Sequence, residues 1–513
     1  MNERNINNPS SRGAILTTLC ADMQISHEVS EEFTLPDYVP EVRRVLNTRA
    51  KALPEGKFMS ESGANTSLEL DGTVTYSIIY TDDEGKLCSI SLSSSYNTSA
   101  ILSCTPQKTL IDTSIDNVSC RVNAPRKLTV KTRLKSRILA FSDDTIDENI
   151  SPRSTADEIY IERRTKNVNT VSLKSISMQN IKMSDRFDMN NNSELTPIMC
   201  DAGIVINDCK AQSGSVSVRG EATVKCICSD GERCITLTKV LPVYEELEAD
   251  GAEPSDMARC NARCISLAIS NEQNSDTSQL FFDLNCEIEG EFYRNIESTL
   301  TEDCYSTKYE TDASYRNIDT YSLLSAKNNS FSINDKFKRK DGNIEDIVDV
   351  ICDAVAESAE TANGKLIFKG RINALVIGRS KMGDDGAYEY LSESYEIPFG
   401  FDVLCDAESV VSRATYDVKV TSARYDNDKF AIGCDIYSSY VILKKGSDRI
   451  LDSAIIKKDK EYKGNAACVR VFFPKDGDIL WEVAKKYHTT ERKIMEDNGL
   501  STYSLEGVKS III

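Results

Sequence analysis

One alternating segment occurs three times in this chain, and each copy carries a glycine at its fifth position. The glycines are Gly72, Gly220 and Gly370, which are separated by 148 and 150 residues. Self-similarity at a fixed long period indicates a repeated structural unit. The three copies are LELDGTVTYSIIY at 68–80, VSVRGEATVKCIC at 216–228 and LIFKGRINALVIG at 366–378.

Around each glycine, apolar side chains fall on every second position, with polar side chains between them. A period of two over this length predicts a strand that is buried on one face. A glycine inside such a strand indicates a bulge or the close approach of another backbone. Its presence in all three copies favours a role in the fold over a role in ligand approach. Turns rich in Asp and Gly follow the copies and predict hairpins at 82–85, 229–231 and 383–386.

Each unit is expected to be a mainly antiparallel β domain, packed as a sandwich or an open barrel. A short helix is also expected, because apolar residues recur at helical spacing over Val39–Leu46 and Ile344–Ile351. Polar segments at 142–158 and 297–330 are interpreted as connections. The expected domains span residues 1–145, 146–296 and 297–445, followed by a linker at 446–466 and a different module at 467–513.

The composition of the 513 residues is that of a globular protein, with 40% apolar and 27% charged residues. The 80 acidic and 61 basic residues give a formal charge of −19, which disfavours nucleic-acid binding because affinity for phosphate depends on Lys and Arg. No apolar run reaches the ~18 residues that a membrane-spanning helix needs. The first twenty residues contain no apolar stretch of signal-peptide length, so a cytoplasmic protein is expected.

The 17 cysteines are interpreted for a reducing compartment, where structural disulfides are rare, and are expected to be reduced and mostly inaccessible. Cys226 and Cys228 form a CxC pair that could hold a metal, but they occupy the apolar frame of Ile78 and Tyr80 in the first copy. Free cysteine often packs as a small apolar side chain. We therefore expect core cysteines, and no metal or other cofactor.

The sequence offers little for catalysis. The two histidines, His27 and His488, have none of the partners expected of a catalytic triad, and a cell-wall hydrolase would need such a set. A phosphate-binding GxxxxGK loop is absent. Acidic pairs such as Asp82-Asp83 are interpreted as solvated turns rather than calcium ligands. A protein without enzymatic activity is expected.

From Ala467 the pattern changes to strand, helix, helix and strand within fifty residues. Asp478 and Thr490 are the residue types that cap helix N-termini. Asn498-Gly499 is a helix-stop signal. The expected segments are a strand at 469–473, a helix after Asp478, a helix from Thr490 to Asn498 and a strand at 508–513.

This module resembles a LysM domain, and the matching residues are Gly477-Asp478, Leu480-Trp481, Ala484, Lys486-Tyr487, Thr489-Thr490 and Asn498. The resemblance implies two helices on a two-stranded sheet, with a shallow groove that binds N-acetylglucosamine-containing glycans such as peptidoglycan. It maps that groove to Gly477, Asp478, Ile479, Leu480, Asn498 and Leu500.

Two residues of the module point toward a protein ligand instead. Ile479 stands where the family often has Thr or Ser, whose hydroxyl can hydrogen-bond a sugar. Trp481 is the only Trp of the chain and is a candidate anchor for a partner, since Trp leads among interface hot spots. The alternative is that Trp481 packs the core of the small module. The sequence leaves both alternatives open.

The repeats are similar to the SPOCS domain of the SipL and SpoVID family of spore-coat morphogenetic proteins. The similarity in the first copy lies in Leu35-Pro36-Asp37, Ile78-Ile79-Tyr80 and Pro125-Arg126-Lys127-Leu128. It implies a structural adaptor in the mother-cell cytoplasm that is recruited to the forespore surface and anchors the coat there. The partners implied are a SpoIVA-type coat ATPase and other coat proteins. The alternative is a LysM protein that binds peptidoglycan or N-acetylglucosamine oligomers without a role in the coat.

Overall fold

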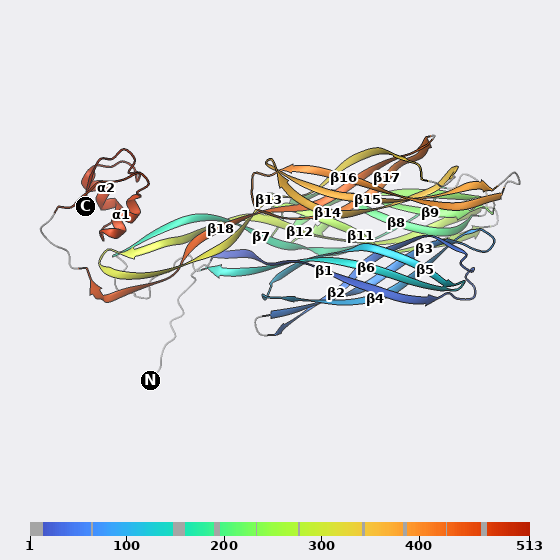
Figure 1. The fold of residues 1–513 in the computed structure, drawn as a ribbon, viewed down its shortest axis with the longest axis horizontal. Coiled ribbons are helices and arrows are strands. Elements are labelled where there is room, and N and C mark those ends of the chain that lie inside the picture. The colour runs from blue at the N-terminus through green and yellow to red at the C-terminus, as the bar shows by residue number, and fades with distance from the viewer. Residues whose placement is uncertain are drawn as a thin grey trace.

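The computed structural model describes residues 14–62, 65–146, 160–188, 195–231, 233–274, 277–340, 344–382, 387–426, 428–462 and 469–513. These residues form an elongated body of strands with a small helical module at one end (Figure 1). Within the described residues, no helix is long and apolar enough to cross a membrane.

The strands before the C-terminal module fall into three units of six. Unit 1 contains β1 (Ala14–Thr34), β2 (Arg44–Ser62), β3 (Asn65–Thr81), β4 (Leu87–Leu102), β5 (Lys108–Ala124) and β6 (Lys127–Ile146). Unit 2 contains β7 (Ile161–Arg186), β8 (Thr196–Gln212), β9 (Ser215–Ser229), β10 (Cys234–Glu248), β11 (Met257–Asn274) and β12 (Thr277–Ser306). Unit 3 contains β13 (Tyr309–Lys338), β14 (Asp346–Ala362), β15 (Lys365–Met382), β16 (Ala387–Leu404), β17 (Val410–Asp426) and β18 (Lys429–Glu461).

All three units share one topology, in which six strands form two three-stranded antiparallel sheets. In unit 1 the sheets are β2-β3-β4 and β1-β6-β5. Unit 2 repeats them as β8-β9-β10 and β7-β12-β11, and unit 3 as β14-β15-β16 and β13-β18-β17. The strand pairs confirm the hairpins expected at 82–85 and 229–231. The turn expected at 383–386 lies outside the described residues.

The two sheets of each unit enclose a hydrophobic core, so each unit is a β-sandwich. In unit 1 the core joins Val74 and Tyr76 of β3 to Leu128 and Val130 of β6. The cores of units 2 and 3 are built in the same way from both of their sheets. The alternating residues of the repeat form the inner face, which confirms the prediction of mainly antiparallel β domains.

The repeated glycines lie where two strands come too close for a side chain. Gly72, Gly220 and Gly370 each stand opposite a bulge in the preceding strand, which lies between Ile206 and Asp208 in unit 2. A Cβ at Gly220 would overlap the carbonyl oxygen of Val205, and the equivalent carbonyls crowd the other two glycines. The interpretation that these glycines serve the fold is confirmed.

The short helices expected at Val39–Leu46 and Ile344–Ile351 are wrong. The first segment is a turn that leads into β2, and the second leads into β14. Both strands begin with a bulge, at Val45/Asn47 and at Ile347/Asp349. A bulge adds one residue to a strand and breaks its period of two, so apolar residues recur at a spacing that resembles a helix.

The polar segment expected to be a connection at 297–330 is also strand. It forms the end of β12 and most of β13. Likewise, β18 continues to Glu461 through most of the expected linker at 446–466. These strand ends pair as two ribbons, β7 with β12 and β13 with β18, that extend beyond the sandwiches toward the C-terminal module (Figure 1). We call these ribbon ends, residues 161–168, 299–306, 309–318 and 448–461, the arm.

The three sandwiches pack around a common axis. Ile79, Ile227 and Ile377 follow the same step of the repeat, and all three lie in one buried cluster. A second cluster gathers residues of the β1-β6-β5 sheet and of its equivalents, among them Phe141 and Tyr293. The arrangement is therefore pseudo-threefold, with one sandwich at each corner.

Two arginines bridge the units near this axis. Arg49 of unit 1 binds Asp201 of unit 2 and Asp353 of unit 3. Arg413 of unit 3 binds Asp112 of unit 1, and its Nη1 lies 2.7 Å from the carboxylate of Glu291 in unit 2. Removing one unit would leave buried charge without a partner, which is strongly unfavourable.

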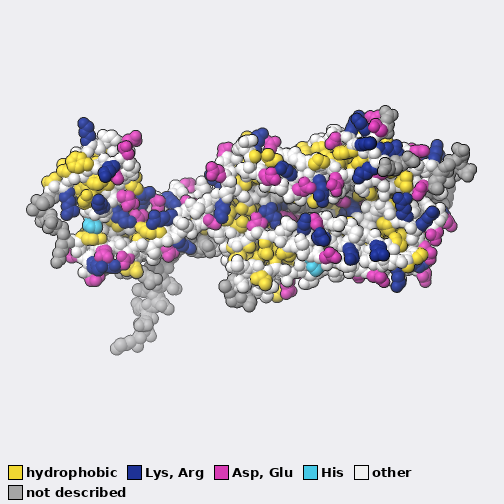
Figure 2. Space-filling model, in the orientation of Figure 1, with side chains coloured by type: hydrophobic (Ala, Val, Ile, Leu, Met, Phe, Trp, Pro, Cys, Tyr) yellow, Lys and Arg dark blue, Asp and Glu magenta, His cyan; other side chains and the backbone are white. Residues whose placement is uncertain are grey.

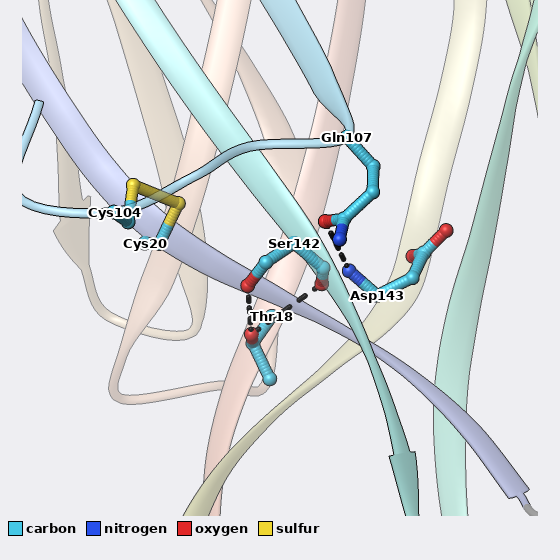
Figure 3. Close-up of a disulfide and its surroundings, with 6 residues drawn as sticks. All are labelled: Thr18, Cys20, Cys104, Gln107, Ser142 and Asp143. Carbon is cyan, nitrogen blue, oxygen red and sulfur yellow. Dashed lines mark hydrogen bonds between the residues drawn. A yellow bond between two sulfur atoms is a disulfide. The ribbon is translucent and has the colours of Figure 1, made fainter. Parts of the chain in front are cut away.

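One cysteine pair differs from expectation. Cys20 in β1 and Cys104 in the connection between β4 and β5 form a disulfide (Figure 3). Nearby, the Thr18 and Ser142 hydroxyl oxygens are 2.9 Å apart, which ties β1 to β6. The expectation of reduced cysteines is wrong for this pair, because local sequence cannot show that residues 84 positions apart meet. The core interpretation is confirmed for Cys226, Cys228, Cys260, Cys286 and Cys434, which are buried.

We predict that Gly220→Ala destabilises the scaffold, because the new methyl group would overlap the Val205 carbonyl. Overpacking of this kind costs about 1–3 kcal/mol of unfolding free energy. Thermal unfolding followed by circular dichroism measures the change. The matched control is Gly203→Ala, where an added Cβ meets nothing within 4 Å. Equal melting temperatures for the two variants would contradict the explanation.

Candidate functional site

The C-terminal module is a short two-helix structure. It contains β19 (Val471–Phe472), α1 (Leu480–Lys486), α2 (Glu491–Asn498) and β20 (Ile511–Ile512), in the expected order. The two short strands pair antiparallel. Leu480, Ala484, Ile494 and Ile511 are buried between the helices and the sheet. This core is small, so the module exposes a large share of its surface.

The helix-end predictions are confirmed for α2 and wrong for α1. Thr490 accepts a hydrogen bond of 3.0 Å from the Lys493 N–H, and Gly499 ends α2 in the left-handed conformation. At α1 the N-cap residue is Ile479, and no side chain caps the helix. Asp478 instead accepts a 2.8 Å hydrogen bond from the Lys475 N–H, because it closes the turn that precedes the helix.

The residues expected in the groove divide into two groups. Gly477 and Ile479 are exposed, and Asp478 is half-buried beside them. Leu480 is a core residue, and Leu500 packs half-buried against the same core. The Asn498 side chain holds β20, since it donates to the Ile512 carbonyl at 2.7 Å and accepts from the Ile512 N–H at 2.6 Å. The exposed part of the expected groove is therefore the loop 477–479.

A second loop lies against this one and brings a residue that sequence reasoning missed. Ile479 forms an isolated antiparallel bridge with Ser504. The residue before Ser504 is Tyr503, which is 63% exposed, and Ile479 is 45% exposed. Figure 2 shows hydrophobic side chains gathered on this module. The sequence did contain a signal for this residue, because Tyr503 is an aromatic residue among polar neighbours, five positions after the end of α2.

Trp481 points away from these loops and contacts the arm. Its indole Nε1 donates a 2.8 Å hydrogen bond to the carboxylate of Asp303 in β12. Its ring packs edge-on against Tyr305, with 4.9 Å between ring centroids. Because of these contacts only 4% of Trp481 is exposed. Trp481 is thus both a core residue of the module and an anchor, and the anchor binds this chain's own β12.

Further contacts complete this joint between module and arm. Lys485 of α1 binds Asp303 at 2.7 Å, and the Tyr315 hydroxyl donates to the same carboxylate at 2.6 Å. The Tyr305 hydroxyl donates to the Thr489 carbonyl at 2.8 Å. Burial alone would raise the pKa of Asp303, but the hydrogen bonds from Lys485, Tyr315 and Trp481 hold it below its ordinary value. Asp303 is therefore an anion at neutral pH, and it holds the joint through three donors.

The two histidines lie apart. His27 is in β1, paired with Leu134, whereas His488 lies two residues after the end of α1 and stacks on Tyr462, which follows the last residue of the arm. Burial and the nearby charge of Arg470 lower the pKa of His488. Among the described residues, no group of three or more His, Cys, Asp or Glu is placed to hold a metal ion.

We predict that Asp303→Ala releases the module from the arm. The substitution removes the acceptor of Trp481 and Lys485, so the Trp481 emission is expected to shift to the red and its quenching by acrylamide to increase. Trp481 is the only Trp, so the signal is unambiguous. The control is Asp312→Ala, which removes an exposed arm carboxylate paired with Lys457. An unchanged emission spectrum in Asp303→Ala would show that the joint does not depend on this carboxylate.

No curated protein matches this chain, and no solved structure matches it. The match that exists covers only the C-terminal end. Residues 475–513, which contain α1, α2 and β20, match the family model described as the LysM domain, so the chain carries a C-terminal LysM domain.

Proposed function

We propose that this protein is a non-enzymatic adaptor that carries a LysM domain on a β scaffold and uses the loops 477–479 and 503–505 to bind a ligand. The observation that carries the proposal is the orientation of α1. Trp481 is buried on the arm, whereas Ile479, two residues earlier, is exposed. The face that holds the domain in place is thus different from the face that is free to bind.

The match to LysM makes a peptidoglycan glycan the first candidate ligand. Tyr503 supplies an exposed aromatic ring, which can pack against the apolar face of a sugar. The loop backbones at Gly477 and Asp478 lie close by and carry hydrogen-bonding groups.

A protein ligand is the second candidate, and the apolar character of the same surface favours it. Ile479 and Tyr503 are both exposed, and no side-chain hydroxyl stands at position 479. An aromatic and an aliphatic side chain together form the kind of anchor that protein interfaces use. This candidate fits the wider proposal that the adaptor works in endospore coat assembly, in the mother-cell cytoplasm, where a SpoIVA-type ATPase would be its partner at the forespore surface.

The segments that resemble the SPOCS domain support this wider proposal by meeting in one place. The Leu35 N–H donates to the Arg126 carbonyl at 2.8 Å. The Arg126 guanidinium donates in turn to the carbonyls of Pro36, at 2.9 Å, and Val39, at 2.7 Å. The two sequence segments are therefore one structural element of unit 1, at the end of the scaffold that is distant from the LysM domain (Figure 1).

We predict that the full chain co-sediments with insoluble peptidoglycan and that Tyr503→Ala weakens this binding about tenfold, which corresponds to about 1.4 kcal/mol. The loss follows from removing the exposed ring of the loop that pairs with Ile479 through Ser504. Asp497→Ala, another exposed change on α2, is the control. A parallel assay uses purified SpoIVA-type ATPase with the same variants.

The two assays separate the candidates. Sedimentation that depends on Tyr503 supports the glycan, and ATPase binding that depends on Tyr503 without sedimentation supports the protein partner. If neither ligand binds, or if Tyr503→Ala and Asp497→Ala behave alike in both assays, these loops are not the binding surface.

A further inference from the structure

A cavity of about 690 Å³ lies between the three sandwiches. Its walls come mainly from the edge strands of the sheets, β2 and β5 of unit 1, β8 and β11 of unit 2, and β14 and β17 of unit 3. The lining mixes charged and hydroxyl side chains with apolar ones, which include Leu53, Ile115 and Val240. The cavity exists only because the three units are assembled, and it belongs to neither the LysM domain nor the arm.

The cations that line the cavity all have carboxylate partners, which lie in its wall or, for Glu221 and Glu287, directly behind it. Arg49 is held by Asp201 and Asp353, and Lys51 lies 2.7 Å from Asp201. The other three ion pairs are Lys225 with Asp349, Lys419 with Glu221, and Arg263 with Glu287. Matched pairs of this kind leave little attraction for an anionic ligand.

One lining carboxylate stands outside these pairs. Tyr416 and Val418 of β17 pack against the core of unit 3, so the alternation of the strand places Asp417 on the cavity side. Within the described residues, Asp417 makes no ion pair or hydrogen bond. The charged group that acts on the Asp417 carboxylate is Lys51. The Lys51 ammonium already donates hydrogen bonds to Asp201 and to the Ala202 carbonyl.

We propose that the axial cavity binds an organic ammonium ion, with the Asp417 carboxylate as its counter-charge and the apolar walls around its aliphatic part. A single carboxylate suits one ammonium group. A bare divalent cation is less suited, because Ca²⁺ and Mg²⁺ require six or more oxygen ligands and one free carboxylate supplies only two.

The ionisation of Asp417 makes this binding depend on pH. Asp417 is surrounded by the protein atoms of the cavity wall, although its side chain is exposed to the space inside the cavity. The surrounding protein displaces bulk water from the carboxylate and raises its pKa to about 7, while the charge of Lys51 opposes the shift. The ionised fraction therefore increases about tenfold between pH 6 and pH 8, while a primary amine stays protonated at both values. The other titratable or charged groups that line the cavity are Arg49 from β2, Asp201 from β8, Lys225 from β9, Arg263 and Cys264 from β11, Asp349, Cys352 and Asp353 from β14, and Tyr416 and Lys419 from β17.

Isothermal titration of the full chain with n-hexylammonium tests the proposal, and n-hexanol serves as the uncharged probe of equal length. We expect saturable 1:1 binding of hexylammonium at pH 8, about tenfold weaker at pH 6, and no comparable binding of hexanol. Asp417→Asn should abolish the difference between the two probes. Asp426→Asn, the same change on the same strand but at an exposed ion pair with Lys336, should leave it intact.

A second variant tests the location without changing a charge. Gly203 lines the cavity, and a Cβ added there meets nothing within 4 Å, so Gly203→Phe should fill the space and prevent binding in a folded protein. Unchanged affinity in Gly203→Phe, equal losses in Asp417→Asn and Asp426→Asn, or no binding to the wild-type chain would each overturn the proposal.

Stability gives an independent readout of Asp417. Its pKa is higher in the folded state than the ordinary value near 3.8, so the folded chain holds the proton longer and loses stability as pH rises from about 4 to about 7. Asp417→Asn is therefore expected to melt at a higher temperature than wild type at pH 8 and at the same temperature at pH 4. A variant that is less stable than wild type at pH 8 would mean that a partner already neutralises Asp417.

Discussion

Ile79, Ile227 and Ile377 sit on the outer face of the central strand of their sheets, where an isolated sandwich would expose them to water. In the assembled scaffold all three are buried, and burying a side chain of this size contributes about 1.5–3 kcal/mol. Each sandwich therefore has two apolar surfaces to cover, its own core and the strip that faces the axis. The bridging arginines depend on the same assembly, since Arg49 and Arg413 find their carboxylates only in other units. The position of the arm, and with it that of the LysM domain, follows from this arrangement.

Much of the fold could be predicted from local pattern. The period of two identified the central strands, and the glycine shared by the three copies identified a point of close backbone contact. The sequence also contains an indication that the units pack on one another. Ile79, Ile227 and Ile377 are apolar residues at a polar position of the alternating pattern, at the same step of each copy. A single extra apolar residue, however, does not say what covers it. That depends on contacts between residues about 150 positions apart.

The wrong predictions about helices and connections share one cause, which is that a local pattern has more than one physical origin. Bulges at Val45/Asn47 and Ile347/Asp349 produced a spacing that is typical of a helix. The segment 297–330 looked like a connection because it is rich in polar residues, whereas its apolar side chains, such as Cys304, are covered by the facing ribbon at Leu451 and Ala454. For the candidate site, the LysM resemblance located the loop 477–479. It could not locate Tyr503, nor could it show that Trp481 binds Asp303, which lies 178 residues earlier in the chain.

The strand that carries the LysM domain also has a mechanical consequence. β18 is 33 residues long, and it pairs with β13 over nearly its whole length and with β17 over its first half. A pull on the LysM domain would be transmitted along the direction of β18. Hydrogen bonds between antiparallel strands lie perpendicular to that direction, so they resist in shear, all together, rather than opening one after another. A chain built in this way can hold tension between whatever the LysM domain grips and whatever the three sandwiches rest on.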